Sequence, residues 1–71
     1  MDASVAREIN ELMLKYGAEL NSSVGLVKSH CTKEEFESYR GAVARILGYM
    51  FLDIMNPLYR EHPELKPSDF E

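Results

Sequence analysis

Apolar residues in the first half of the chain recur every three or four positions. At about 100° of rotation per residue, this spacing places them along one side of an α-helix. We therefore expect one amphipathic helix over residues 3–29, with Asp2 or Ser4 as its N-cap. Two glycines and the polar run 21–23 weaken this helix, so a break near residue 21 is the competing interpretation. The apolar positions are Val5, Ile9, Leu12, Met13, Tyr16, Leu20, Val24 and Val27.

A capping box in the middle of the chain predicts the start of a second helix. Thr32 offers an N-cap hydroxyl, and Glu35 stands three residues later, where its carboxylate can reach back to the cap. Cys31 and Phe36 occupy the two positions of a hydrophobic staple. We expect the second helix over residues 33–56, so that the two halves of the chain form an antiparallel hairpin.

The second helix is apolar around most of its circumference. On a helical wheel, one group of apolar residues forms a full core face, and a second group lies nearly opposite. A helix of this kind is normally buried on more than one side, and one partner helix cannot cover it. The core face comprises Phe36, Tyr39, Val43, Ile46, Leu47, Met50 and Ile54, extended by Phe51 and Met55; the second group comprises Gly41, Gly48 and Leu52, with Ala44 between the two.

Asn56 and Pro57 interrupt the apolar pattern of the second half. Proline lacks an N–H and disfavours a helical residue before it, although it suits the first turn of a helix. We expect Asn56 to cap a short third helix over residues 57–62, and a kinked continuation of the second helix is the alternative. Two further prolines and no periodicity predict an extended tail over residues 63–71. Residues 1–62 then form a single helical-hairpin domain.

The small size of the chain predicts an assembly. With 71 residues a single core is marginal, and the one cysteine and two histidines provide neither an intrachain disulfide nor a zinc-site spacing. We therefore expect an all-α homodimer, a four-helix bundle in which the second helices meet at a twofold axis. Its predicted interface is Gly41, Ala44, Gly48, Phe51, Leu52 and Met55. The alternative is a monomeric three-helix domain in which the segment after Pro57 folds back over the second helix, with Leu58, Tyr59, Leu65 and Phe70 as its apolar face.

Charge and hydropathy indicate which partners and which cellular compartment the protein is suited to. Twelve acidic residues against eight basic ones give a formal charge of −4, which argues against a large phosphate-binding surface. The N-terminus lacks the basic and apolar regions of a signal peptide, and the most apolar stretch, residues 43–55, is too short and too polar to span a bilayer. We expect a cytoplasmic protein with no membrane contact, and the charge disfavours a nucleic-acid partner.

Few residues suggest catalysis. Cys31 lies beside His30 at a helix start, where the helix dipole lowers a thiol pKa, but no third group orients the histidine. A hydrophobic staple explains Cys31 better. His30 and His62 with Glu34 or Glu61 are pairings that occur by chance in most sequences. We therefore predict no enzyme activity, no catalytic residues, no cofactor and no metal.

The leading hypothesis from the sequence is a non-enzymatic helical homodimer that acts by binding another, unidentified protein, as an adaptor, modulator or inhibitor. Tyr49, Tyr59 and Phe70 are the candidate partner contacts, because amphipathic aromatics with few rotamers suit interfaces. One alternative is a nucleic-acid-binding dimer in which the basic residues Arg7, Lys15, Lys28, Arg40 and Arg45 converge across the twofold axis. A remote alternative is an enzyme or phosphotransfer role for His30 and Cys31. The likeness to small helical-hairpin dimers is architectural and implies no function.

Overall fold

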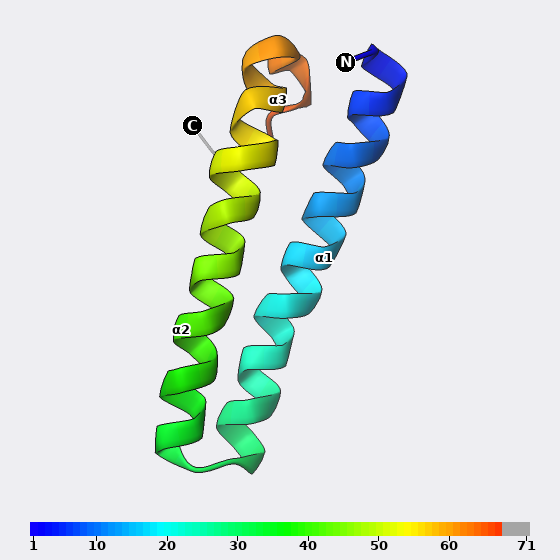
Figure 1. Ribbon diagram of the computed structural model, residues 1–71. Helices are drawn as coiled ribbons and strands as arrows, with labels where there is room; N and C mark the ends of the chain where they lie inside the picture. Colours follow the sequence, from blue (N-terminus) through cyan, green and yellow to red (C-terminus); the bar gives the residue numbers. More distant parts are fainter. Residues whose placement is uncertain (68–71) are drawn as a thin grey trace.

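The computed structural model describes residues 1–67 and shows an antiparallel hairpin of two long helices (Figure 1). The hairpin measures 44 × 20 × 16 Å. The all-α hairpin predicted from the sequence is thereby confirmed. In chain order its elements are α1 (Ala3–His30), α2 (Lys33–Tyr49), the π-helix η1 (Met50–Met55), α3 (Asn56–Glu61) and the 3-10 turn η2 (Pro63–Leu65).

Helix α1 is a single unbroken helix. The Asp2 side chain caps its start by accepting a hydrogen bond from the Ser4 N–H at 3.2 Å. Ser23, one residue of the polar run that could have broken it, is half-buried between the two helices. The Ser23 hydroxyl lies 2.6 Å from the Leu20 carbonyl oxygen and 2.7 Å from the Tyr39 hydroxyl on α2. These contacts give a polar residue of α1 partners on both helices, so the helix continues through it.

The turn between α1 and α2 contains the predicted capping box. The Thr32 hydroxyl accepts a hydrogen bond from the Glu35 N–H at 3.1 Å, and a Glu35 carboxylate oxygen accepts from the Thr32 N–H at 3.1 Å. The same oxygen lies 3.0 Å from the Thr32 hydroxyl. The hydrogen bond from the Thr32 backbone, followed by that from its hydroxyl, lowers the pKa of Glu35.

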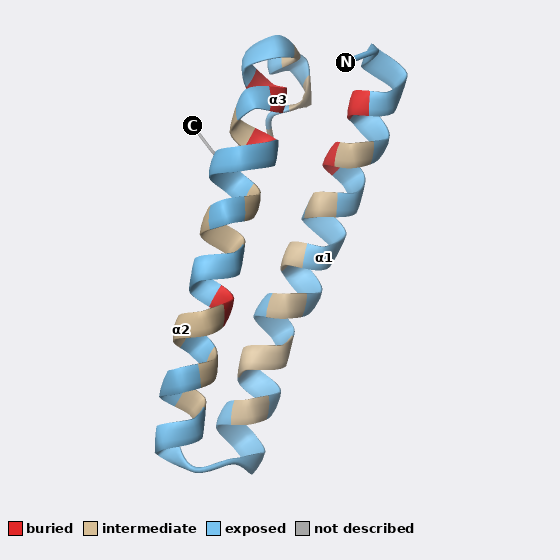
Figure 2. Ribbon diagram, in the orientation of Figure 1, coloured by how far each residue is buried: buried red, intermediate tan, exposed pale blue. Residues whose placement is uncertain are grey.

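The seam between the helices uses more small and polar residues than the apolar pattern predicts. On α1 the inward positions alternate by four and three residues, the spacing of a heptad stripe. Ala6 and Asn10 are buried there, whereas Val5, Leu12 and Tyr16, which the sequence placed on the stripe, are exposed. Figure 2 shows most of the buried positions near the end of the hairpin opposite the turn between α1 and α2. Val43 is buried closer to that turn, on α2. The α1 seam is Ala6, Asn10, Met13, Gly17, Leu20, Val24 and Val27.

A π turn separates α2 from α3 and changes which side chains face α1. In a regular α-helix the seam position after Met50 would be Ile54, but Ile54 is 40% exposed and Met55 is buried. The wider turn therefore inserts one residue into the stripe. Beyond it, the buried residues Leu58 and Tyr59 continue the seam.

The short third helix predicted over residues 57–62 is present as α3 (Asn56–Glu61), but Asn56 does not cap it. Asn56 has helical dihedral angles, φ −64° and ψ −47°, and its N–H donates to the carbonyl of Phe51, five residues earlier. The helical rod therefore passes Pro57 without a break, and the predicted N-cap role of Asn56 is wrong. A proline inside an α-helix clashes with the carbonyl four residues earlier. The wider π turn just before Pro57 relieves that crowding.

The segment after α3 turns back onto α1 instead of extending away. Residues 63–65 form η2, so the predicted extended tail is wrong for these three residues. The Asn10 side-chain N–H donates to the Leu65 carbonyl at 3.4 Å, and His62 Nε2 lies 2.8 Å from the Met1 carbonyl oxygen. The Met1 ammonium pairs with the Glu61 carboxylate and lowers the pKa of that carboxyl.

Replacing Gly25 with alanine should stabilise the protein. A Cβ at this position meets no atom within 4 Å, so alanine gains helix propensity without a clash. We expect the free energy of unfolding to rise by about 0.5–1 kcal/mol in urea titrations at fixed protein concentration. Gly17→Ala is the matched comparison, because its Cβ would meet Leu47 at the ordinary contact distance of 3.7 Å. A loss of stability in Gly25→Ala would contradict the open surroundings of this glycine.

Removing the cap with Thr32→Ala should cost about 0.5–2 kcal/mol at neutral pH. Because the folded pKa of Glu35 is lowered, the stability from this carboxylate is present above its unfolded pKa and is lost as the pH falls through its folded value. The difference between wild type and Thr32→Ala should therefore shrink in acid. Urea titrations at neutral pH and below the ordinary glutamate pKa measure it. A difference that stays constant would show that the Thr32 hydroxyl contributes nothing to stabilising the Glu35 carboxylate.

Candidate interaction surface

One face of the hairpin carries a second row of apolar side chains, beside the seam. On α1 these are Val5, Ile9, Leu12 and Tyr16, on α2 they are Ile46 and Tyr49, and on η1 the row ends with Ile54. All except the half-buried Ile9 are exposed, with exposed fractions from 39% for Leu12 to 68% for Tyr49. We call this surface the open face.

The hydrogen bond between Ser23 and Tyr39 shows that both rows lie on the same side of the hairpin. Ser23 stands two helical turns after Tyr16 on α1, and Tyr39 stands two turns before Ile46 on α2. Residues seven apart share a helix face. Because Ser23 and Tyr39 meet across the seam at 2.7 Å, Tyr16 and Ile46 border the same side of that seam.

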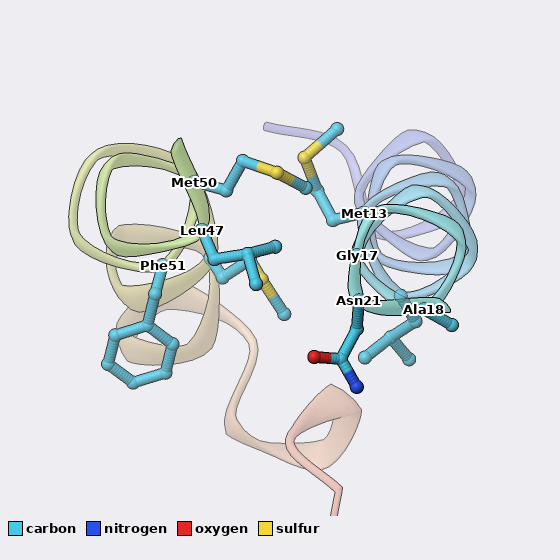
Figure 3. Close-up of a pocket in the computed structure, with 9 residues that line it drawn as sticks. Met13, Gly17, Ala18, Asn21, Leu47, Met50 and Phe51 are labelled. Carbon is cyan, nitrogen blue, oxygen red and sulfur yellow. The ribbon is translucent and has the colours of Figure 1, made fainter. Parts of the chain in front are cut away.

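The other side of the hairpin has a shallow groove of about 340 Å³. Figure 3 shows Leu47 of α2 and Met50 of η1 reaching toward α1, with Phe51 at one wall and Ala18 and Asn21 at the other. We call this side the groove face. Its lining is almost entirely apolar, and its α1 wall is low because Gly17 and Ala18 have small or no side chains.

A buried polar pair fixes the upper part of the hairpin. The Tyr59 hydroxyl donates to the Asn10 side-chain oxygen at 2.5 Å, and both residues are about 5% exposed. Burial raises the pKa of Tyr59, so the phenol stays neutral at physiological pH. The second group of Asn10, its N–H, is the donor to Leu65 described above. Asn10 therefore ties α1 to both α3 and the segment that follows it.

The structure divides the residues predicted to mediate self-association. Ala44, Phe51 and Leu52 are exposed and Gly41 and Gly48 are half-buried, but Met55 is buried within the chain. The π turn explains Met55, because the inserted residue rotates it into the seam. Leu52, 61% exposed, is one of the most exposed of these positions.

The three aromatic residues predicted to contact a partner have different places. Tyr49 is 68% exposed on the open face and is available for contact. Tyr59 is buried and bonded to Asn10, so its prediction as an exposed contact is wrong, again because of the one-residue shift at η1. Phe70 lies outside the described residues.

The residues considered for catalysis or metal binding lie at two opposite ends of the hairpin, where His62 contacts Glu61 at 3.2 Å but neither histidine reaches the other. His30 and Cys31 are exposed at the turn, whereas His62 lies at the opposite end of the hairpin. Within residues 1–67, no group of three or more histidine, cysteine or acidic side chains could hold a metal ion. Among these same residues, no helix is long and apolar enough to cross a membrane.

The basic residues are also spread along the hairpin. Lys28 and Arg40 both lie over the Phe36 ring near the turn, at 5.9 and 5.5 Å from its centroid. Arg7 stands in the second turn of α1, toward the other end. Within one chain these side chains do not form the continuous patch on which nucleic-acid binding depends.

No known protein family, curated protein or solved structure matches this chain. The functional argument therefore depends on the surfaces of the hairpin alone.

Sequence reasoning missed the Asn10–Tyr59 pair and the true α1 seam. The signal for the seam was present in the regular spacing of Ala6, Asn10 and Gly17 with the larger residues. It is found only when small and polar residues are counted along with apolar ones. The signal for the π turn was the five-residue spacing between Met50 and Met55, where a regular seam has a spacing of three or four residues.

Replacing Tyr59 with phenylalanine should destabilise the protein by about 1–3 kcal/mol, because the buried Asn10 oxygen loses its donor. Urea titration at fixed protein concentration measures this loss. Tyr49→Phe is the matched control and should change little, since Tyr49 is mostly exposed. Adding Asn10→Leu to Tyr59→Phe should recover most of the loss, because both buried polar groups are then gone. A neutral Tyr59→Phe would mean that Asn10 is satisfied in another way.

Proposed function

We propose that this protein is a non-enzymatic helical module that self-associates as a homodimer and works by binding another protein. The observation that carries this proposal is the amount of apolar surface that one chain leaves exposed. Among the described residues, only Ala6, Val43, Met55, Leu58 and Tyr59 form the buried apolar core. Eleven large apolar side chains are classed as exposed in the same part of the chain.

The balance between these two sets supports self-association. Six of these eleven side chains lie together on the open face, and an exposed apolar patch on a small chain is typical of interaction sites. Burying a large apolar side chain contributes about 1.5–3 kcal/mol, so an interface covering several of them could exceed the stability of the hairpin alone. Folding and assembly would then be coupled, and stability would depend on protein concentration.

The role in binding another protein is supported by the two distinct sides of the hairpin. If one side is occupied by a second copy, the other remains available to a different partner. The shapes of the two sides differ, since one has the groove beside Gly17 and the other has a raised apolar row. Such a division gives one small chain both an assembly surface and a recognition surface.

Sedimentation equilibrium over a wide concentration range, with thermal unfolding on the same samples, tests the self-association. We expect a mass of two chains and a melting temperature that rises with concentration. A stably folded single chain at every concentration would overturn the proposal. Affinity capture from native extract, with an open-face variant and a groove-face variant as separate baits, then identifies which side binds another protein.

A further inference from the structure

The open face continues the heptad spacing of a four-helix bundle. On α1 the open-face positions 5, 9, 12 and 16 alternate by four and three residues, in parallel with the seam stripe, and Ser23 follows seven residues after Tyr16, with Glu19 at the intervening position. On α2, Tyr39 and Ala42 lie in the same row as Ile46 and Tyr49, and these four positions are separated by three, four and three residues. The next step, from Tyr49 to Ile54, is five residues, and the seam has the same five-residue step from Met50 to Met55. Each helix therefore has two neighbouring heptad stripes, of which the hairpin uses one.

Two stripes per helix is the pattern that a four-helix bundle requires, because each helix there packs against two neighbours. A second hairpin laid on the open face supplies those neighbours. A twofold axis parallel to the helices would place α1 of one subunit against α2 of the other, antiparallel as in the hairpin itself. The same kind of packing then repeats around the bundle.

Charges at the edges of the open face complement each other in this arrangement. Gly17 lies opposite Leu47, with 3.7 Å between its Cβ position and the Leu47 side chain. Because the helices are antiparallel, the residue two positions after Gly17 and the residue two positions before Leu47 lie at the same level along the hairpin axis. Glu19 on α1 is therefore level with Arg45 on α2.

These two side chains stand on opposite outer edges of the open face within one chain. Both are exposed, and among the described residues neither forms an ion pair. The twofold axis would bring Glu19 of one subunit beside Arg45 of the partner subunit, twice per dimer. An opposite arrangement of the two hairpins, with their turns at opposite ends, would not give this match.

The groove face is less suited to a second copy. Asn10 reaches its bond with Leu65 on that side, so η2 lies over the end of the groove. Figure 3 shows the segment after α3 below the groove, on the side of Phe51 and Asn21. The outer side of α2, with Leu52 and Gly48, is apolar only locally, next to Arg45 and Tyr49.

We infer that the open face is the twofold interface of the homodimer, with α1 packed against the partner's α2 and Glu19 paired with Arg45 of the partner subunit. This inference rests on the proposed self-association and specifies its surface. It replaces the interface around Gly41, Gly48 and Leu52 predicted from the sequence.

One pair of variants separates the two surfaces. Ile46→Glu places a charge at the centre of the open face, and Leu52→Glu places the same charge on the outer side of α2. Both positions are exposed in the single chain, so the helical content in circular dichroism should not fall from a packing defect within the hairpin. We expect Ile46→Glu to weaken the dimer at least about a hundredfold, since two buried isoleucines are lost, and Leu52→Glu to change it little.

A charge exchange tests the orientation. Glu19→Arg and Arg45→Glu should each weaken their own homodimer about tenfold, because each brings like charges together across the axis. Mixed in equal amounts at low salt, the two variants should prefer the heterodimer, in which both pairs are opposite in sign. Native mass spectrometry resolves the two homodimers and the heterodimer by their masses.

The outcomes distinguish the inference from the proposed function. If the wild-type protein is a single chain, self-association itself is wrong. If it is a dimer that Ile46→Glu leaves intact and Leu52→Glu dissociates, the open face is wrong and the outer side of α2 is the interface. A statistical mixture of charge variants, with Ile46→Glu still disruptive, refutes the orientation and the Glu19–Arg45 pair.

Discussion

Two helices can cover only one stripe of each other, and this limit governs the structure. A helix about 10 Å across contacts its neighbour along a single line of ridges and grooves. In this hairpin that line is occupied on α1 by the row from Ala6 to Val27. Every further apolar residue must face solvent or another molecule. The exposed row on the open face follows from this geometry and not from any local irregularity.

The π turn at η1 keeps the two stripes in phase along the whole rod. Without the inserted residue, Ile54 and Glu61 would face α1, and Tyr59 would point away from Asn10. With it, Tyr59 reaches Asn10, and Ile54 is exposed on the open face. One wide turn before Pro57 thus serves both the interior and the surface. The proline, which looked like the end of a helix, marks where the register changes.

The parts of the fold that local rules determine were predictable from the sequence. The capping box at Thr32 and Glu35 depends only on residues three apart, and the structure has it with both hydrogen bonds. The hairpin followed from that box and the two periodic halves. The seam was harder, because the apolar pattern favours Val5 and Tyr16 over Ala6 and Gly17, and only contact with α2 decides between them.

The sequence predicts that an apolar surface is exposed, but it does not predict which residues form that surface. A surplus of apolar surface on α2 could be counted directly from the sequence. Its position could not, because the helical wheel assumed a constant 100° per residue through residue 55. Past Met50 that assumption puts Ile54 in the core face and Met55 only at its extension, whereas in the structure Ile54 is 40% exposed and Met55 is buried. A wheel error of one residue is enough to exchange core and surface.

The composition of the seam gives a reason for the hairpin to depend on assembly. Ala6, Asn10 and Gly17 fill three of the seven α1 seam positions, and each removes little apolar area from water. Asn10 contributes specificity through Tyr59 rather than a large hydrophobic gain. The bulky residues Leu12, Tyr16 and Ile46 stand instead on the open face. In the proposed dimer, covering the open face would remove these large side chains from water, a gain that the small side chains at the three seam positions do not supply.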